Sequence, residues 1–136
     1  MIMFLTSLIM LERGYDYLQV SFTVAIHVVG MFAFSSLIGI LTDIIGRKYV
    51  SIIGMLILAI GCFITPLTAN FYIITLGLFL IGLGWSCANI ASTSMIADIN
   101  PVNIRGRVIG VNDMLSGAFS VLFTLIGPII ANYSSL

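Results

Sequence analysis

The chain has 136 residues, of which 60% are hydrophobic and 7% are charged, and its five basic and five acidic side chains leave no net charge. Soluble domains carry about 25% charged residues. This composition therefore excludes a water-soluble enzyme, and it excludes a disordered chain, which needs low hydrophobicity. A neutral chain has no basic field to attract phosphates, which excludes a nucleic-acid binder. The class that remains is an integral membrane protein, whose first partner is the lipid bilayer.

Long uncharged runs separate the charged residues, and these runs define the expected helices. A bilayer core about 30 Å thick needs roughly 20 helical residues. The run from 49 to 97 is too long for one crossing, and Asn70, shortly after Pro66, is its natural break. The runs lack the alternation of barrel strands. We therefore predict one all-α membrane domain, residues 1–136, with a short helix at residues 1–11 and full spans at 18–41, 49–69, 71–97 and 108–131.

The segment at residues 1–11 has about half the length that a span needs. It is either a truncated span or the apolar core of a signal peptide. The second reading lacks a charged region before the core and a small-residue cleavage site after it. We favour a truncated span, and four full spans plus a partial one predict a piece of a larger bundle.

Basic residues gather on one side of the predicted membrane domain. Residues 42–48 hold two of them and residues 98–107 hold two more, whereas the opposite side holds only Arg13. The positive-inside rule places the two richer loops in the cytoplasm. The chain then starts on the cytoplasmic side, and residues 134–136 lie outside.

The thirteen glycines predict close helix packing, because small side chains let two backbones approach each other. Gly84, Ala88 and Ser92 recur at every fourth position of the 71–97 helix, and Ser35 and Gly39 have the same spacing. The alternative is that these glycines only reflect the composition of membrane helices.

The most specific motif lies at residues 39–48 and reads G-x-L-x-D-x-x-G-R-K. Gly39 would let another helix approach the end of its own helix. Gly46 permits a tight reversal with positive φ. Asp43 lies within reach of Arg47 and Lys48, and a neighbouring helix N-terminus would also favour its carboxylate.

At this motif the sequence resembles the major facilitator superfamily of secondary transporters, whose six-helix halves carry a signature loop between their second and third helices. Further similarity, over about residues 15–133, looks like a bacterial drug-antiporter-like branch and its C-terminal half, although both halves can carry the loop. The resemblance implies that the chain corresponds to the seventh to eleventh helices of such a transporter and lies in a bacterial cytoplasmic membrane. It also implies the other half of the transporter as a partner. The segments that carry it begin at His27, Gly82, Arg105 and Asn112. Phe34 and Ser86 depart from the branch, which often has proline and asparagine there.

The resemblance also implies a role for the cytoplasmic charges. In related transporters the loop aspartate and arginine join an acidic residue at the end of the half's fourth helix in a charge relay that holds one conformation. Here those residues are Asp43, Arg47 and Asp98, and Arg105 and Arg107 lie in the next loop. The alternative is that all of these are solvated charges that only set the topology.

Polar groups inside the spans are the candidates for the substrate or proton pathway, because ionisable residues in a membrane are costly and usually functional. His27, a residue type that changes charge near neutral pH, either couples protons, contacts substrate, or makes a neutral hydrogen bond between helices. Asp113 lies about 8 Å into its helix, and it either pairs with a nearby arginine or relays protons. Trp85 and Asn89 either line a pocket or bond between helices.

One histidine and two cysteines in different spans give no metal-ligand spacing, so we expect no metal and no cofactor. The sequence contains no nucleophile-and-base arrangement, and the pair Gly82 and Gly84 lacks the third glycine of a dinucleotide fingerprint, so we expect no enzyme.

The function that we predict is transport of a small molecule, with the proton as coupling ion, by alternating access between two halves. One alternative is a non-transporting membrane subunit or fragment that docks to a partner. Another is a small four-helix transporter that works as a dimer, but such proteins place an essential acid within the first helix. Here that segment carries only Glu12, at its end.

Overall fold

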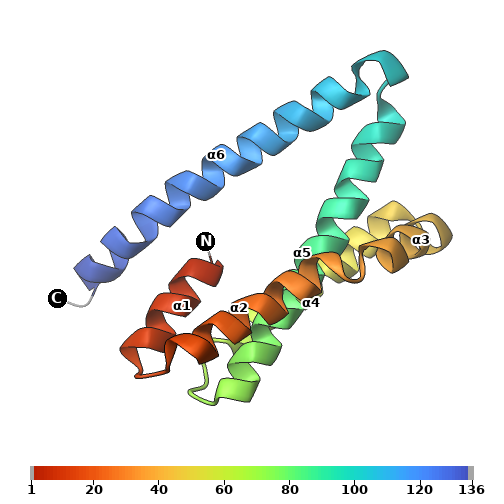
Figure 1. Cartoon of the computed structure of the whole chain (residues 1–136). Helices are drawn as coiled ribbons and strands as arrows, with labels where there is room; N and C mark the ends of the chain where they lie inside the picture. Colours follow the sequence, from red (N-terminus) through yellow and green to blue (C-terminus); the bar gives the residue numbers. More distant parts are fainter. Residues whose placement is uncertain (1, 135–136) are drawn as a thin grey trace.

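The computed structural model describes residues 2–134, with the side chains of Ile2, Pro128 and residues 131–134 left aside. Every regular element in this range is an α-helix, and four segments are long and apolar enough to cross a membrane, which confirms the predicted fold class. The predicted location of residues 135 and 136 lies outside the described part. The helices shown in Figure 1 are α1 (Ile2–Glu12), α2 (Tyr17–Phe32), α3 (Ser35–Ile45), α4 (Arg47–Ile64), α5 (Phe71–Ile99) and α6 (Val102–Ser134).

The helices continue through the charged clusters at which the sequence predicted loops. Only Gly46 separates α3 from α4, and only Asn100 and Pro101 separate α5 from α6. The reason is that charged side chains at a helix end can reach water while their backbone stays helical. At its other end α4 stops at Ile64 rather than at residue 69, because Pro66 cannot continue a helix.

The span predicted as one helix at residues 18–41 is broken between α2 and α3. Phe34 has φ −100° and ψ 3°, which lies outside the helical region. The Ser35 hydroxyl donates a hydrogen bond to the Phe32 carbonyl, and adjacent serines are a known cause of sharp helix bends. The two helices still form one crossing segment, Tyr17–Ile45.

The contact between α4 and α5 has no room for side chains at its glycines. A Cβ on Gly54 would lie 2.6 Å from the Cβ of Cys87 and 2.8 Å from the backbone nitrogen of Ala88. A Cβ on Gly84 would lie 2.6 Å from the carbonyl oxygen of Gly54. The close packing predicted for Gly84 is therefore confirmed. Among the described residues no helix approaches Gly39, because a Cβ there would meet no atom within 4 Å, and the approach predicted at this position stays a prediction.

The contact between α2 and α5 is also close, and it includes polar bonds. A Cβ on Gly30 would lie 2.7 Å from the Phe79 carbonyl oxygen. The hydroxyl oxygens of Thr23 and Thr75 lie 3.0 Å apart, so that one hydroxyl can donate to the other in place of the carbonyl of its own helix. Helices α2, α4 and α5 therefore form one packed unit, which we call the three-helix unit (Figure 1).

Helix α6 stands apart from this unit. It diverges from α5 at their joint and runs back toward α1 (Figure 1), where a Cβ on Gly127 would lie 3.8 Å from the Leu5 side chain. None of the residues in its most apolar stretch is buried. A cavity that forms part of the candidate site lies between α5 of this unit and α6.

Candidate functional site

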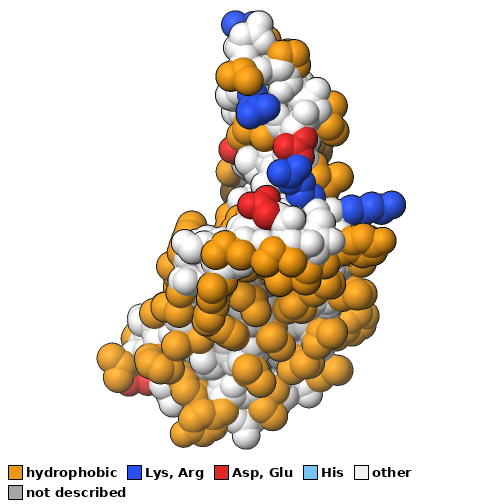
Figure 2. Space-filling model, turned by 90° about the vertical axis from the view of Figure 1, so that its right-hand side faces the viewer, with side chains coloured by type: hydrophobic (Ala, Val, Ile, Leu, Met, Phe, Trp, Pro, Cys, Tyr) orange, Lys and Arg blue, Asp and Glu red, His pale blue; other side chains and the backbone are white. Residues whose placement is uncertain are grey.

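The first part of the site is an ion cluster at the ends of α3, α4 and α5. The Arg47 guanidinium contacts the Asp43 carboxylate at 3.6 Å, and it contacts the Asp98 carboxylate through its other terminal nitrogen. The structure thus brings together the three residues of the predicted relay. Figure 2 shows red and blue side chains side by side where the narrow upper part of the molecule meets its apolar body.

The backbone of Gly46 explains how this cluster forms. Its φ of 103° and ψ of 141° belong to a region that residues with a side chain avoid, and the predicted positive φ is thus observed. One residue therefore reverses the chain between α3 and α4, and it places Arg47 directly after the end of α3.

The ion cluster is partly open to water. The side chain of Arg47 is 37% exposed, that of Asp98 is 45% exposed and that of Asp43 is 74% exposed. Exposed ion pairs contribute roughly 0–1 kcal/mol, so a modest competing interaction would be enough to open the cluster. The Nε atom of Arg47 is buried and has no partner among the described residues.

The other basic residues of this edge are placed differently. Lys48 and Arg107 are exposed, and the described residues give neither of them an ion pair. A terminal nitrogen of Arg105 lies 3.5 Å from the Asn100 carbonyl oxygen, across the joint between α5 and α6. The pairing considered between Asp113 and an arginine is not observed, because the Asp113 carboxylate instead accepts a hydrogen bond of 3.5 Å from the Asn112 amide.

The second part of the site is a cleft between α5 and α6. It contains a cavity of about 440 Å³ whose wall is formed by six residues, of which two come from α5 and four from α6. These residues are Trp85, Asn89, Asp113, Ser116, Gly117 and Ser120. Three of the four residues predicted for the substrate or proton pathway therefore share one cavity.

The fourth of these residues, His27, lines a cavity of about 390 Å³ that also includes Trp85 and Ser120 in its wall. The two cavities adjoin through these two shared residues. His27 and Asp113 thus line two neighbouring cavities that share Trp85 and Ser120, and we call the two cavities together the cleft. Ser116 and Ser120 were not predicted from the sequence. They follow Asp113 by three and seven positions and so lie on the same face of the helix, which could have indicated them.

His27 itself lies at the crossing of α2 and α5. It is 8% exposed, and its Nδ1 lies 2.7 Å from the Leu78 carbonyl oxygen. A carbonyl oxygen can only accept a hydrogen bond, so Nδ1 carries the proton and donates. The residue therefore makes the hydrogen bond between helices that the sequence left open, and it also borders the cleft. Among residues 2–134, no three histidine, cysteine or acidic side chains are grouped as metal ligands would be.

Comparison with known proteins decides the family. The sequence profile of the Major Facilitator Superfamily matches residues 1–136. The chain belongs to the major facilitator superfamily. No solved structure matches it.

Three relatives show the range of this superfamily. The MFS-type transporter YddS of Bacillus subtilis is 30% identical over 84% of the chain and 27% of its own length. The vacuolar membrane amino acid uptake transporter fnx2 of Schizosaccharomyces pombe is 27% identical over 82% of the chain and 19% of its own length. The facilitated glucose transporter member 12 of solute carrier family 2 in Homo sapiens is 26% identical over 71% of the chain and 15% of its own length. The chain thus spans less than a third of these relatives.

Proposed function

We propose that the chain forms part of a proton-coupled secondary transporter that exports a small molecule by alternating access. The observation that carries this proposal is the cleft, in which an acid, an amide, an aromatic ring and two hydroxyl groups meet between membrane-spanning helices. Polar groups at this depth are expensive unless water or a substrate solvates them.

Each cleft residue has a chemical role in this proposal. The Asp113 carboxylate accepts and releases the coupling proton. Trp85 and Asn89 contact the substrate through a flat apolar ring and an amide that can both donate and accept. The Nε2 of His27, which has no partner among the described residues, accepts a proton or a hydrogen bond at the far end of the cleft.

The ion cluster is the proposed gate. It ties the end of α5 to the reversal between α3 and α4, and its exposed pairs are weak enough to break during each cycle. In the proposed cycle the cluster is closed in one orientation of the cleft and open in the other.

The open side of α6 supports a second half as partner. A helix with no buried residue in its apolar stretch has contact surface left over, and secondary transporters bind their substrates between two halves. In this proposal the chain corresponds to the C-terminal half of the transporter and resides in a bacterial cytoplasmic membrane. The relatives are named for amino acids and for glucose, so the substrate class is left open.

The test uses vesicles with a pH-sensitive dye inside and a panel of amino acids, sugars and cationic drugs outside. We expect no substrate-dependent proton movement with the chain alone, and movement when it is combined with a complementary half of a major-facilitator transporter. Proton-driven transport by the chain alone would contradict the need for a second half. Absence of transport by the combined halves would favour the alternative, a membrane subunit that only docks.

Two variants separate pathway from gate in the transporting assembly. Asp113→Asn removes the proposed proton carrier, and we expect it to abolish proton movement while substrate still binds. Asp43→Asn weakens the ion cluster and should slow transport without abolishing binding. Glu12→Gln is the matched control, because Glu12 is an exposed acid at the opposite end of the molecule. Unchanged transport in both variants would overturn the assigned roles.

A further inference from the structure

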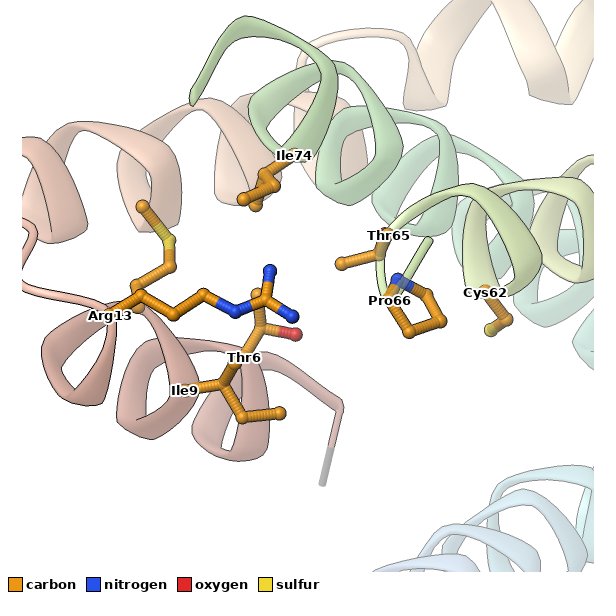
Figure 3. Close-up of a pocket in the computed structure, with 8 residues that line it drawn as sticks. Thr6, Ile9, Arg13, Cys62, Thr65, Pro66 and Ile74 are labelled. Carbon is orange, nitrogen blue, oxygen red and sulfur yellow. The ribbon is translucent and has the colours of Figure 1, made fainter. Parts of the chain in front are cut away.

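A third cavity lies at the end of the molecule opposite the ion cluster, between α1, the end of α4 and the beginning of α5 (Figure 3). Its volume is about 140 Å³, and none of the residues in its wall borders the cleft. The apolar side chains of Ile9, Met10 and Ile74 form much of the wall, and Arg13 and Cys62 also line it. The cavity is therefore separate from the proposed transport path.

The size of this cavity sets the size of a ligand. An apolar protein cavity of about 150 Å³ is large enough to hold benzene. The hydrocarbon part of a ligand here would thus have about six carbon atoms.

The guanidinium of Arg13 sets the charge of the ligand. One of its terminal nitrogens donates a hydrogen bond of 2.7 Å to the Thr68 carbonyl, and the described residues supply no acceptor for its other N–H groups. Figure 3 shows the guanidinium reaching into the space between α1 and the start of α5. The wall contains no carboxylate. The backbone N–H of Asp16 donates a hydrogen bond to the Gln19 side chain at the start of α2, and the ion pairs of the described residues join neither Asp16 nor Glu12 to Arg13.

We propose that this cavity binds a small hydrophobic carboxylate of about the size of benzoate. Its carboxylate accepts two parallel hydrogen bonds from the planar guanidinium of Arg13, a geometry that arginine forms readily. Its hydrocarbon part packs against Ile9, Met10 and Ile74. Arg13 also holds the connection between α4 and α5, as does the hydrogen bond from the Tyr15 hydroxyl to the Ala69 carbonyl. Binding therefore stabilises the contact between two connections, the one from α1 to α2 and the one from α4 to α5.

Cys62 offers a direct readout of occupancy, because it lines the cavity and is partly exposed. In a Cys87→Ala background it is the one thiol of the chain. The experiment measures the rate at which N-ethylmaleimide alkylates Cys62 in the detergent-solubilised full chain, with increasing benzoate or increasing benzyl alcohol. The two probes have the same ring, and only benzoate is charged.

We expect benzoate to protect Cys62 at a concentration about tenfold lower than benzyl alcohol, because hydrogen bonds to a charged group add that much affinity. Arg13→Gln should remove this difference while protection by benzyl alcohol remains. If that variant does not fold, the comparison of the two probes in the unaltered cavity decides alone. Leu115→Cys, placed on α6 in a chain without the native thiols, is the control for general effects of benzoate on alkylation.

Three outcomes would overturn the proposal. The first is equal protection by benzoate and benzyl alcohol in the chain that retains Arg13. The second is an unchanged advantage of benzoate in Arg13→Gln. The third is equal slowing of alkylation at Leu115→Cys, which would show that the probe acts on the reagent or the detergent rather than in the cavity.

Discussion

Helix α5 has two faces with opposite character. On the face toward α4, a Cβ on Gly61 would lie 2.8 Å from the Gly77 carbonyl oxygen, and Gly84 meets the backbone of α4 as closely. On the face toward α6, Trp85 and Asn89 border an open cavity. Three glycines of α6 also belong to the open side, because a Cβ on Gly106, Gly110 or Gly117 would meet no atom within 4 Å.

The contrast shows what drives packing in a membrane. Lipid tails are as apolar as leucine, so helices associate through shape and hydrogen bonds rather than by removal of apolar surface from water. The α4 face of α5 fits its neighbour at the level of the backbone and forms a fixed wall. The α6 face carries the polar side chains of Trp85 and Asn89, which border a cavity rather than a close backbone contact.

The largest effect is expected where the packed face is filled. In Gly84→Leu the new side chain would collide with backbone atoms of α4, which cannot move aside as a flexible side chain can. We expect a loss of about 3 kcal/mol or more in the free energy of unfolding, measured by titration with sodium dodecyl sulfate in mixed micelles. The matched change Gly110→Leu enters open space and should stay within about 0.5 kcal/mol. Equal losses in both variants would remove the distinction between the two faces.

A smaller effect is expected at the reversal that brings α3 and α4 together. Gly46→Ala forces a side chain into a backbone region that is nearly exclusive to glycine, at a cost of about 2 kcal/mol. Gly39→Ala lies in a helix facing open space, and it should be neutral or stabilising by up to about 1 kcal/mol. The same titration measures both variants. A neutral Gly46→Ala would mean that the reversal does not need this conformation.

The smallest effect is expected for a single hydroxyl in the packed region. Thr23→Val removes the bond to Thr75 at a position that is 1% exposed. We expect a loss of about 0.6 kcal/mol, the typical size of such bonds between membrane helices. Thr124→Val is the control, because the hydroxyl of Thr124 bonds only within its own helix, to the Ser120 carbonyl. A loss in Thr124→Val as large as that in Thr23→Val would contradict the assignment of α6 to the open region.

Local patterns in the sequence predicted much of this arrangement. Charge spacing predicted the number of spans, and the spacing of Gly84 predicted a close contact. The signature motif and its resemblance predicted that Arg47 would lie near Asp43 and Asp98. These predictions agree with the structure because each depends on a strong local rule: the cost of a charge in lipid, the small volume of glycine, and the positive φ at Gly46.

The rest depends on balances that no single residue reveals. The break at Phe34 arises from a serine hydroxyl bonding to the backbone, and the sequence contains no proline or glycine there to signal it. Asp98 and Arg105 stay helical because their side chains reach water without ending the helix. The cleft could be only partly foreseen, because Ser116 and Ser120 acquire meaning once α6 is seen to face Asn89 across a cavity.

The central claim is that the cleft between α5 and α6 admits water, whereas in the chain alone the outer face of α6 meets lipid. Its most direct test is the reaction of Ser116→Cys with a charged, membrane-impermeant thiosulfonate, in a membrane-embedded chain that carries Cys62→Ser and Cys87→Ala. Leu115→Cys serves as the comparison at the same depth on the opposite face of the helix. Because the reaction needs a thiolate and therefore water, we predict rapid modification of Ser116→Cys and little of Leu115→Cys. Equal, slow modification at both positions would contradict the claim.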